Sequence, residues 1–178
     1  MDLGVLQTLI NMNNLVLNNL KTANKDTIEQ IYILNQDLTP MVGSLNSSNE
    51  LKDLIDMSSH SFYIEKKSEL VAFIVCLREN SIYKSQNYIH FNKKYGRFLY
   101  IDRVGIKKKH DNKGIGTHLY EHIFNINDEN ELPICAEVNI EPKNEISLRF
   151  HQKMGFKETS ERTINNNYKV KYLEKNAR

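Results

Sequence analysis

The sequence predicts a single α/β domain, and three stretches of the chain carry that prediction. Residues 98–126 begin as an aromatic and β-branched strand, turn at two glycines and continue with helical periodicity. Residues 134–154 show the same order of strand and helix, and residues 61–77 have the pattern of a hairpin. A chain of 178 residues suffices for one well-buried domain and is short for two.

The first half of the chain is expected to supply a strand, two helices and a hairpin. In order, these are a strand at 15–20, a helix capped by Asp26 or Thr27 and ended by Thr39-Pro40, a helix at about 49–59, and strands at 61–65 and 69–77. The run 70–77 is apolar without interruption, which predicts a strand buried on both faces.

The second half should add strands and helices around the glycine turn. They are a central strand ending near 106, a helix to 126, a strand at 134–140, a helix from Asn144 or Glu145 to Met154, and a strand at 168–173 paired with 156–162. Gly155 is expected at the C′ position of the second of these helices. Residues 79–97 interleave aromatic and polar residues, and a loop packed along one edge is the simpler interpretation.

Composition excludes several functions as the main one. With 24 Lys and Arg against 22 Asp and Glu, the net charge of +2 does not favour nucleic acid or a membrane as principal partner. No stretch reaches the roughly 18 apolar residues that span a bilayer. The N-terminus lacks the basic leader of a signal peptide. We therefore expect a cytoplasmic protein that binds neither nucleic acid nor membrane.

The cysteines and histidines predict neither a disulfide nor a metal site. Cys76 and Cys135 each lie in an apolar, strand-like segment, which is typical of reduced core residues. His118 and His122 have an i, i+4 spacing, but no third ligand accompanies them, so we interpret them as helix surface.

Gly114 and Gly116 lie where the central strand turns into its helix. Without Cβ atoms they let backbone N–H groups approach a ligand closely, and a helix N-terminus carries roughly half a positive charge. A phosphate suits this geometry. The alternative is that the glycines only make a turn and that the basic run Lys107–Lys109 is solvated. A triphosphate-binding regulatory domain is disfavoured, since the Lys-Ser/Thr of a P-loop is missing.

Two motifs together resemble the GCN5-related N-acetyltransferase (GNAT) superfamily. The first is the strand from Tyr100 followed by Asp111-Asn112-Lys113-Gly114-Ile115-Gly116, where relatives have Gln/Arg-x-x-Gly-x-Gly/Ala. The second runs from Glu137-Val138-Asn139 through Asn144 to Met154-Gly155-Phe156. The stretch Phe98–Val104 also resembles a little-characterised bacterial group within the superfamily. Asp111 departs from the usual Gln or Arg.

This resemblance covers about residues 15–175 and implies a particular fold. The expected GNAT fold is α/β, with a mixed, mostly antiparallel sheet of six to seven strands, splayed between the fourth and fifth, and about four helices. Residues 15–178 would form the acetyltransferase domain, and residues 1–14 an N-terminal extension. In such a fold, residues 79–97 precede the central strand and could help to wall the acceptor pocket.

The resemblance also implies an acetyl-CoA site. The pyrophosphate would rest on backbone amides of the glycine turn, and the pantetheine arm would pair with the central strand. Asn144 matches an Asn that contacts the cofactor. The implied cofactor-binding residues are Val104, Gly105, Ile106, Asn112, Lys113, Gly114, Ile115, Gly116, Thr117 and Asn144. No metal is implied.

Two side chains are candidates for proton transfer. Glu137 matches a glutamate that some relatives, including ribosomal-protein N-terminal acetyltransferases, use as base; the alternative is a paired surface charge. His151 stands where many relatives have a Tyr that protonates the thiolate, and an imidazole with a pKa of about 6.5 can donate; otherwise it bonds the cofactor or local backbone. Asp102 and Arg103 are adjacent on one strand and should point to opposite sides.

The function implied is an acetyl-CoA-dependent N-acetyltransferase. Its acceptor would be a primary amine: a small amine, an amino acid or a protein N-terminus. The alternative is a catalytically idle GNAT module that binds CoA or a protein partner. The sequence does not fix the oligomeric state, and a homodimer is compatible with it.

Overall fold

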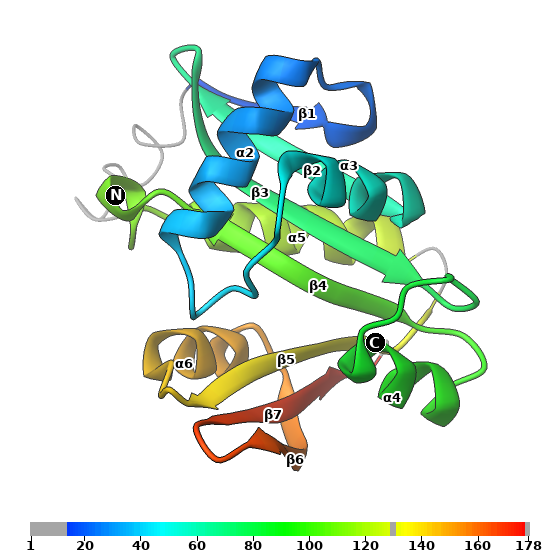
Figure 1. The fold of residues 1–178 in the computed structure, drawn as a ribbon. Helices are drawn as coiled ribbons and strands as arrows, with labels where there is room; N and C mark the ends of the chain where they lie inside the picture. The colour runs from blue at the N-terminus through cyan, green and yellow to red at the C-terminus, as the bar shows by residue number, and fades with distance from the viewer. Residues whose placement is uncertain (1–13, 129–130, 177–178) are drawn as a thin grey trace, which may run out of the picture.

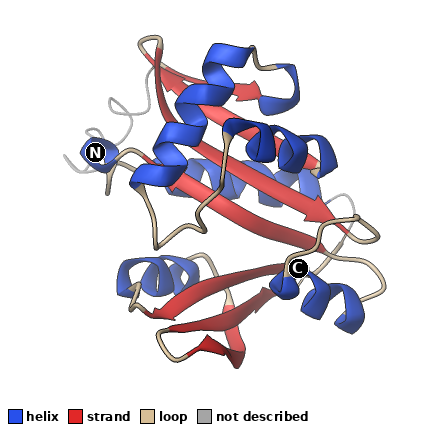
Figure 2. Ribbon diagram, viewed as in Figure 1, coloured by secondary structure: helices blue, strands red, loops and turns tan. Residues whose placement is uncertain are grey.

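The computed structural model describes residues 14–128 and 131–176, in which a seven-stranded sheet carries helices on both faces (Figures 1 and 2). The strand order is β1-β2-β3-β4-β5-β7-β6, and all neighbours are antiparallel except β4 and β5. The predicted mixed, mostly antiparallel sheet is confirmed. The predicted N-terminal extension lies, except for Asn14, outside the described residues.

The bounds of the elements follow the predicted ranges closely, with one exception. The strands are β1 Leu15–Asn19, β2 His60–Lys66, β3 Glu69–Arg78, β4 Leu99–Ile106, β5 Ile134–Glu141, β6 Lys157–Asn165 and β7 Tyr168–Lys175. The helices are α2 Lys25–Asp37, α3 Ser48–Met57, α4 Gln86–Lys94, α5 Ile115–Asp128 and α6 Glu145–Lys153, with short 3-10 turns at Leu20–Thr22 and Lys108–His110. The exception is α4, which occupies the stretch interpreted as a loop.

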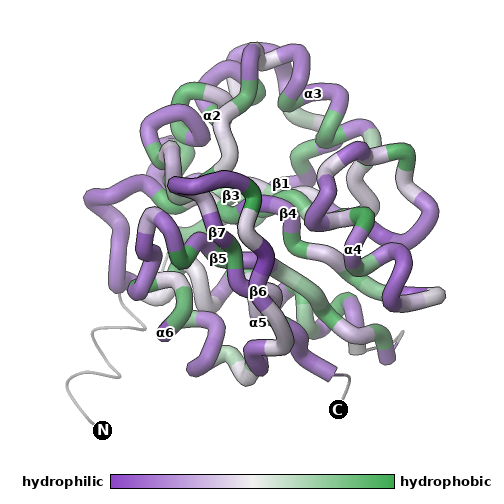
Figure 3. Tube along the Cα trace, turned by 60° about the horizontal axis from the view of Figure 1, so that its bottom comes forward, coloured by the Kyte–Doolittle hydropathy of each residue, from purple (hydrophilic) through white to green (hydrophobic). Residues whose placement is uncertain are grey.

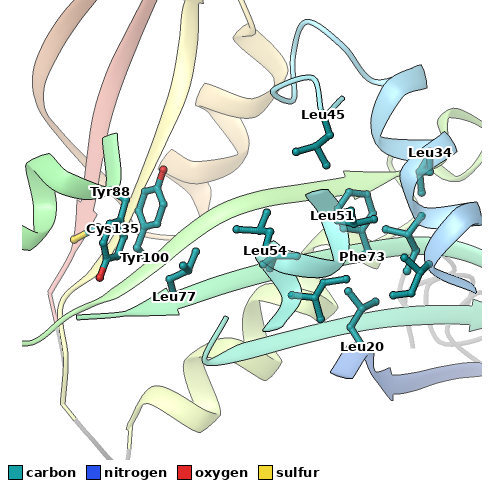
Figure 4. Packing of buried hydrophobic residues seen from close by; sticks show 14 of the residues in the cluster. Leu20, Leu34, Leu45, Leu51, Leu54, Phe73, Leu77, Tyr88, Tyr100 and Cys135 are labelled. Atoms are coloured by element: carbon teal, nitrogen blue, oxygen red, sulfur yellow. The ribbon is translucent and has the colours of Figure 1, made fainter. Parts of the chain in front are cut away.

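Strand β3 is the centre of two hydrophobic cores, as its uninterrupted apolar sequence predicts. On one face, Phe73 and its alternate neighbours pack against α2, α3 and α4 (Figure 4). On the other, Ile74 and its neighbours pack against α5 and α6. Figure 3 shows this hydrophobic interior along β3 and β4, whereas β6 is largely hydrophilic. Cys76 and Cys135 are buried and unpaired, as predicted.

Helix ends are set by short polar side chains and one glycine. The cap of α2 is Asn24, two or three residues earlier than predicted, and its side chain accepts the Thr27 N–H at 2.9 Å. At the end of α6, Gly155 adopts φ +88°, and the Phe156 N–H reaches the His151 carbonyl at 3.0 Å. This is the predicted glycine C-terminus, in its Schellman form.

Strands β4 and β5 pair for only part of their length. Their parallel register covers Leu99↔Ile134, Tyr100↔Cys135 and Ile101↔Ala136. Beyond these pairs β4 remains paired with β3 as far as Ile106, and β5 remains paired with β7 as far as Glu141. The two strands therefore diverge toward the N-terminus of α5, as Figure 1 shows. The predicted splay between the fourth and fifth strands is confirmed.

A β-bulge lies in β4 where the divergence begins. Val75 of β3 pairs with Arg103 and Cys76 pairs with Ile101, so Asp102 is an extra residue without a partner in β3. The bulge cancels the alternation of side chains, and Asp102 and Arg103 lie on the same face as an ion pair of 2.9 Å. The prediction that they point to opposite sides is wrong for this reason.

Beyond the bulge, Gly105 lies against the core and should not tolerate a side chain. A Cβ atom there would be 2.3 Å from Cε1 of the buried Phe73 ring. We predict that Gly105→Ala lowers the free energy of unfolding by about 1–3 kcal/mol, because the ring or the strand must move. The control is Gly96→Ala, where nothing lies within 4 Å of the added atom. Denaturant unfolding that gives the same stability for both variants would contradict this packing.

Candidate active site

The divergence of β4 and β5 opens a cleft of about 670 Å³ that passes between the two faces of the sheet. On one face it is lined by the loop after α2, and on the other by the start of α5 and by α6. Most predicted site residues line it: Val104, Ile106, Asn112, Gly114, Ile115, Gly116, Thr117, Glu137, Asn144 and His151. Gly105 and Lys113 do not, since Gly105 faces Phe73 and the Lys113 ammonium donates to the Lys109 carbonyl at 2.6 Å.

One end of the cleft is the turn that leads into α5. Asn112 and Gly114 have φ of 58° and 80°, the left-handed region that Asn and Gly adopt most readily. The first hydrogen bond of α5 runs from the His118 N–H to the Gly114 carbonyl at 3.0 Å. The preceding N–H groups of the helix have no intrahelical acceptor. They can therefore donate to an anion in the cleft.

Asn144, at the start of α6, also lines the cleft. Its side-chain oxygen accepts the Ser147 N–H at 3.2 Å and so caps α6. Its backbone N–H donates to the Asn139 carbonyl at 3.0 Å, which ties the start of α6 to β5. Asn144 thus has a structural role in addition to its place in the cleft wall.

Glu137 lies one residue beyond the last parallel pair, where β4 and β5 begin to separate. Both carboxylate oxygens are hydrogen-bonded. Oε2 accepts the Tyr100 hydroxyl at 2.7 Å, and Oε1 accepts the Asn87 side-chain N–H at 3.0 Å. Glu137 is therefore not a surface ion pair but a held carboxylate in the cleft wall.

The protonation of Glu137 is strongly perturbed. Burial, together with a smaller effect of the nearby Asp102 carboxylate, raises its pKa from the ordinary value of 4.5 to about 8. The hydrogen bonds from Tyr100 and Asn87 act in the opposite direction. A carboxyl group whose pKa lies near neutrality can accept a proton from an amine and release it again at physiological pH.

The loop after α2 forms another wall of the cleft, and hydrogen bonds from β4 and from β5 hold this loop in place. Arg103 Nη1 donates to the Asn35 side chain at 2.8 Å and to the Gly43 carbonyl at 3.2 Å. From β5, the Asn139 side chain donates to the Pro40 carbonyl at 2.7 Å. These bonds hold the loop in which apolar Met41 and Val42 line the cleft.

His151 is 3% exposed and has both ring nitrogens engaged. Nδ1 lies 2.8 Å from the Ser147 carbonyl, which can only accept, so Nδ1 carries the hydrogen. Nε2 therefore accepts the hydroxyl of Tyr120 at 2.8 Å. Burial lowers the pKa of His151 to about 4. In this state the imidazole is neutral and has no proton facing Tyr120. His151 as proton donor stays a prediction.

Several residues of the site were not predicted from the sequence. Asn87 and Tyr100 donate to Glu137, Asn139 holds the loop after α2, and Tyr120 lines the cleft with its hydroxyl on His151. Asn87 belongs to the aromatic stretch 79–97 and Tyr100 to the central strand, but pairing either with Glu137 requires the three-dimensional register. Within residues 14–128 and 131–176, no cluster of three or more His, Cys, Asp or Glu is placed to hold a metal ion.

These features define a class of protein: an α/β domain with a cleft between two diverging strands and the start of a helix at one end of that cleft. The sequence profile of the acetyltransferase (GNAT) family matches residues 28–156, more than half of the chain. The chain belongs to this family. A comparison with curated protein sequences finds no match. No helix in the described part of the chain is long and apolar enough to cross a membrane.

Solved structures of N-acetyltransferases share the fold. The ribosomal-protein-S18-alanine N-acetyltransferase of Escherichia coli is 11% identical, with a TM-score of 0.64 over 90% of this chain and 92% of that one. Arabidopsis thaliana Naa50, solved with the bisubstrate analogue CoA-Ac-MVNAL, is 20% identical, with a TM-score of 0.67 over 91% and 98%. Arabidopsis thaliana NAA60, also with a bisubstrate analogue, is 13% identical, with a TM-score of 0.70 over 92% and 98%.

The raised pKa of Glu137 predicts a pH-dependent cost in stability. Between pH 4.5 and about 8 the folded protein keeps a proton that the unfolded chain has released, so stability falls as pH rises through this window. Glu137→Gln is neutral at every pH. We predict that its free energy of unfolding, relative to the parent, rises by about 2–4 kcal/mol between pH 5 and pH 9.

Urea unfolding of parent and variant at both pH values measures this difference. The control is Glu121→Gln on the exposed face of α5, which should change stability equally at pH 5 and pH 9. An equal effect of Glu137→Gln at both pH values would show that Glu137 ionises as it does in the unfolded chain.

Proposed function

We propose that this protein transfers the acetyl group of acetyl-CoA to the α-amino group of a peptide or amino acid, with Glu137 as the base. The observation that carries the proposal is the position of Glu137. Its carboxylate is held at the point where β4 and β5 separate, in a cleft that extends to the anion-binding turn before α5.

Acetyl-CoA is proposed to enter from the face of α5 and α6. Its pyrophosphate would accept N–H donors of residues 112–117, and its pantetheine arm would follow Val104 and Ile106, where β4 has no partner on the side of β5. Asn144 would contact the arm from the start of α6. The acceptor would enter from the opposite face, between the loop after α2 and Glu137.

The pKa of Glu137 favours an α-amine over a lysine side chain as acceptor. A free α-ammonium group has a pKa of about 7.7–8.0, whereas that of lysine is about 10.4. Proton transfer to a carboxylate with a pKa of about 8 is nearly balanced for an α-ammonium group. For a lysine ammonium group it is unfavourable by more than two pKa units.

The reaction then needs few protein groups. Glu137 takes a proton from the ammonium group, and the free amine attacks the thioester carbonyl. A C–N bond forms, the C–S bond breaks, and CoA leaves as the thiolate. The nitrogen of the new amide gives up its second proton to the medium, and the thiolate takes one proton from the medium. The balanced outcome is an N-acetyl amide, CoA thiol and one released proton.

The structural neighbours support this choice of acceptor. One is by name an alanine N-acetyltransferase of ribosomal protein S18, and another was solved with an analogue that joins CoA to the peptide sequence MVNAL. The alternative, a module that binds CoA without turnover, is favoured by Asp111 in the anion-binding turn and by the neutral His151.

A free-thiol assay with acetyl-CoA and three acceptors tests the proposal. The acceptors are a lysine-free peptide with a free N-terminus, an N-acetylated peptide with one lysine, and a small diamine. At pH 7 we predict the first to release CoA at least tenfold faster than the others, because only its amine matches the base. Gly114→Val should abolish acetyl-CoA binding, since a branched residue is strained at φ 80° and fills the turn.

The matched control, Gly96→Val, places the same side chain in open space and should leave binding and turnover unchanged. Acetylation of the lysine peptide alone would exclude the α-amine proposal. Tight acetyl-CoA binding by calorimetry without CoA release from any acceptor would instead favour the idle module.

A further inference from the structure

Asn87 reaches the base from an element that the proposed mechanism does not otherwise use. It lies in the first turn of α4, fifty residues before Glu137 in the sequence, and its Nδ2 donates to Glu137 Oε1 at 3.0 Å. The Tyr100 hydroxyl occupies the other carboxylate oxygen from β4. Together the two donors fix the plane of the carboxylate from two separate elements.

The orientation of the Asn87 amide is itself fixed. Its Oδ1 accepts the hydroxyl of Tyr172, on β7, at 3.0 Å. With the Tyr172 hydroxyl on the amide oxygen, the amide nitrogen faces Glu137, whose ionised form only accepts hydrogen bonds. The two hydrogen bonds therefore run in one direction. Tyr172 donates to the side-chain oxygen of Asn87, and the side-chain nitrogen of Asn87 donates to Glu137.

Helix α4 holds Asn87 in place. Tyr88 and Phe91 are 1% and 0% exposed and anchor the helix in the aromatic core near Tyr100 (Figure 4). The Tyr88 hydroxyl donates to the Arg78 carbonyl at 2.8 Å and accepts the Ser81 N–H at 2.8 Å. The position of Asn87 is therefore set by packing that does not involve the cleft.

The groups around Glu137 exert opposing effects. The Asp102 carboxylate disfavours its ionised form, as does burial, and Arg103 favours it. The tyrosines near it are phenols whose own pKa values are raised by burial, so they face Glu137 uncharged at neutral pH: Tyr100, Tyr120, Tyr168 and Tyr172. Asn87 and Tyr100 are the hydrogen-bond donors that favour the carboxylate.

We propose that Asn87 is a positioning residue that orients the Glu137 carboxylate and favours its ionised form, and so sets the pH at which the base works. The inference rests on the proposed function, in which Glu137 takes the proton of the amine. Loss of one charge-assisted hydrogen bond should shift the ionisation of the carboxyl upward by about one pH unit. A residue that only packed α4 against the sheet would not move it.

The test is a carboxyl titration by NMR of the full chain with ¹³C-labelled glutamate, which needs no acceptor. The resonance that disappears in Glu137→Gln is that of Glu137. We predict that Asn87→Ala moves its midpoint upward by about one pH unit. Gln86→Ala, at the exposed neighbouring position on α4, should leave it unchanged. An unchanged midpoint in Asn87→Ala, with a folded protein, overturns the proposal.

A second variant keeps the test decisive if Asn87→Ala does not fold. Tyr172→Phe removes only the hydroxyl that orients the amide, and it should shift the midpoint upward by a smaller amount; no shift overturns the proposal. With an accepted peptide, Asn87→Ala should move the acidic limb of kcat/KM to higher pH and regain the parent rate above it. Absence of acetyl transfer in the parent would refute the proposed function, whatever the titration shows.

Discussion

The site depends on one constraint: β4 and β5 share hydrogen bonds over three residue pairs and then part. Each strand remains paired on its outer side, with β3 or with β7, so the separation does not unravel the sheet. Backbone groups on the inner edges are left without a strand partner, and unsatisfied backbone groups inside a protein are costly. A strand-like ligand such as the arm of CoA can satisfy them. The bulge at Asp102 and the tight contact of Gly105 with Phe73 lie on the same stretch of β4 and fix its course.

The same opening places the Glu137 carboxylate in the wall of the cleft, where the proposed acceptor and acyl donor would meet. Glu137 is stabilised as an anion by hydrogen bonds from α4 and β4, and destabilised by burial and by Asp102. The ion pair of Asp102 and Arg103 has a second effect, since Arg103 also holds the loop after α2. The charge near Glu137 and the position of the loop after α2 are therefore coupled through adjacent residues of β4.

Much of the fold follows from the sequence because it is encoded locally. The apolar run of β3, the glycine turn before α5 and the Gly-Phe end of α6 each specify their own conformation. The site was less predictable, because its contacts join distant segments. Helix α4 has polar and aromatic residues interleaved without a clear apolar stripe, so it resembled a loop. The bulge at Asp102 has no signal in a strand of otherwise regular alternation, and it reverses the expected side of Arg103. The pairing of Asn87 with Glu137 joins α4 to β5 across fifty residues of sequence.

The most direct test of Glu137 as the base is the pH dependence of kcat/KM for acetylation of a peptide α-amine by the parent and by Glu137→Gln. The account predicts that the variant keeps its affinity for acetyl-CoA and is slower by about 10²–10⁴ at pH 7. The deficit should shrink as the pH rises above 8, because the free amine no longer needs a base. Near-parental turnover of Glu137→Gln at pH 7 would contradict the account, because the held carboxylate would then not be the base.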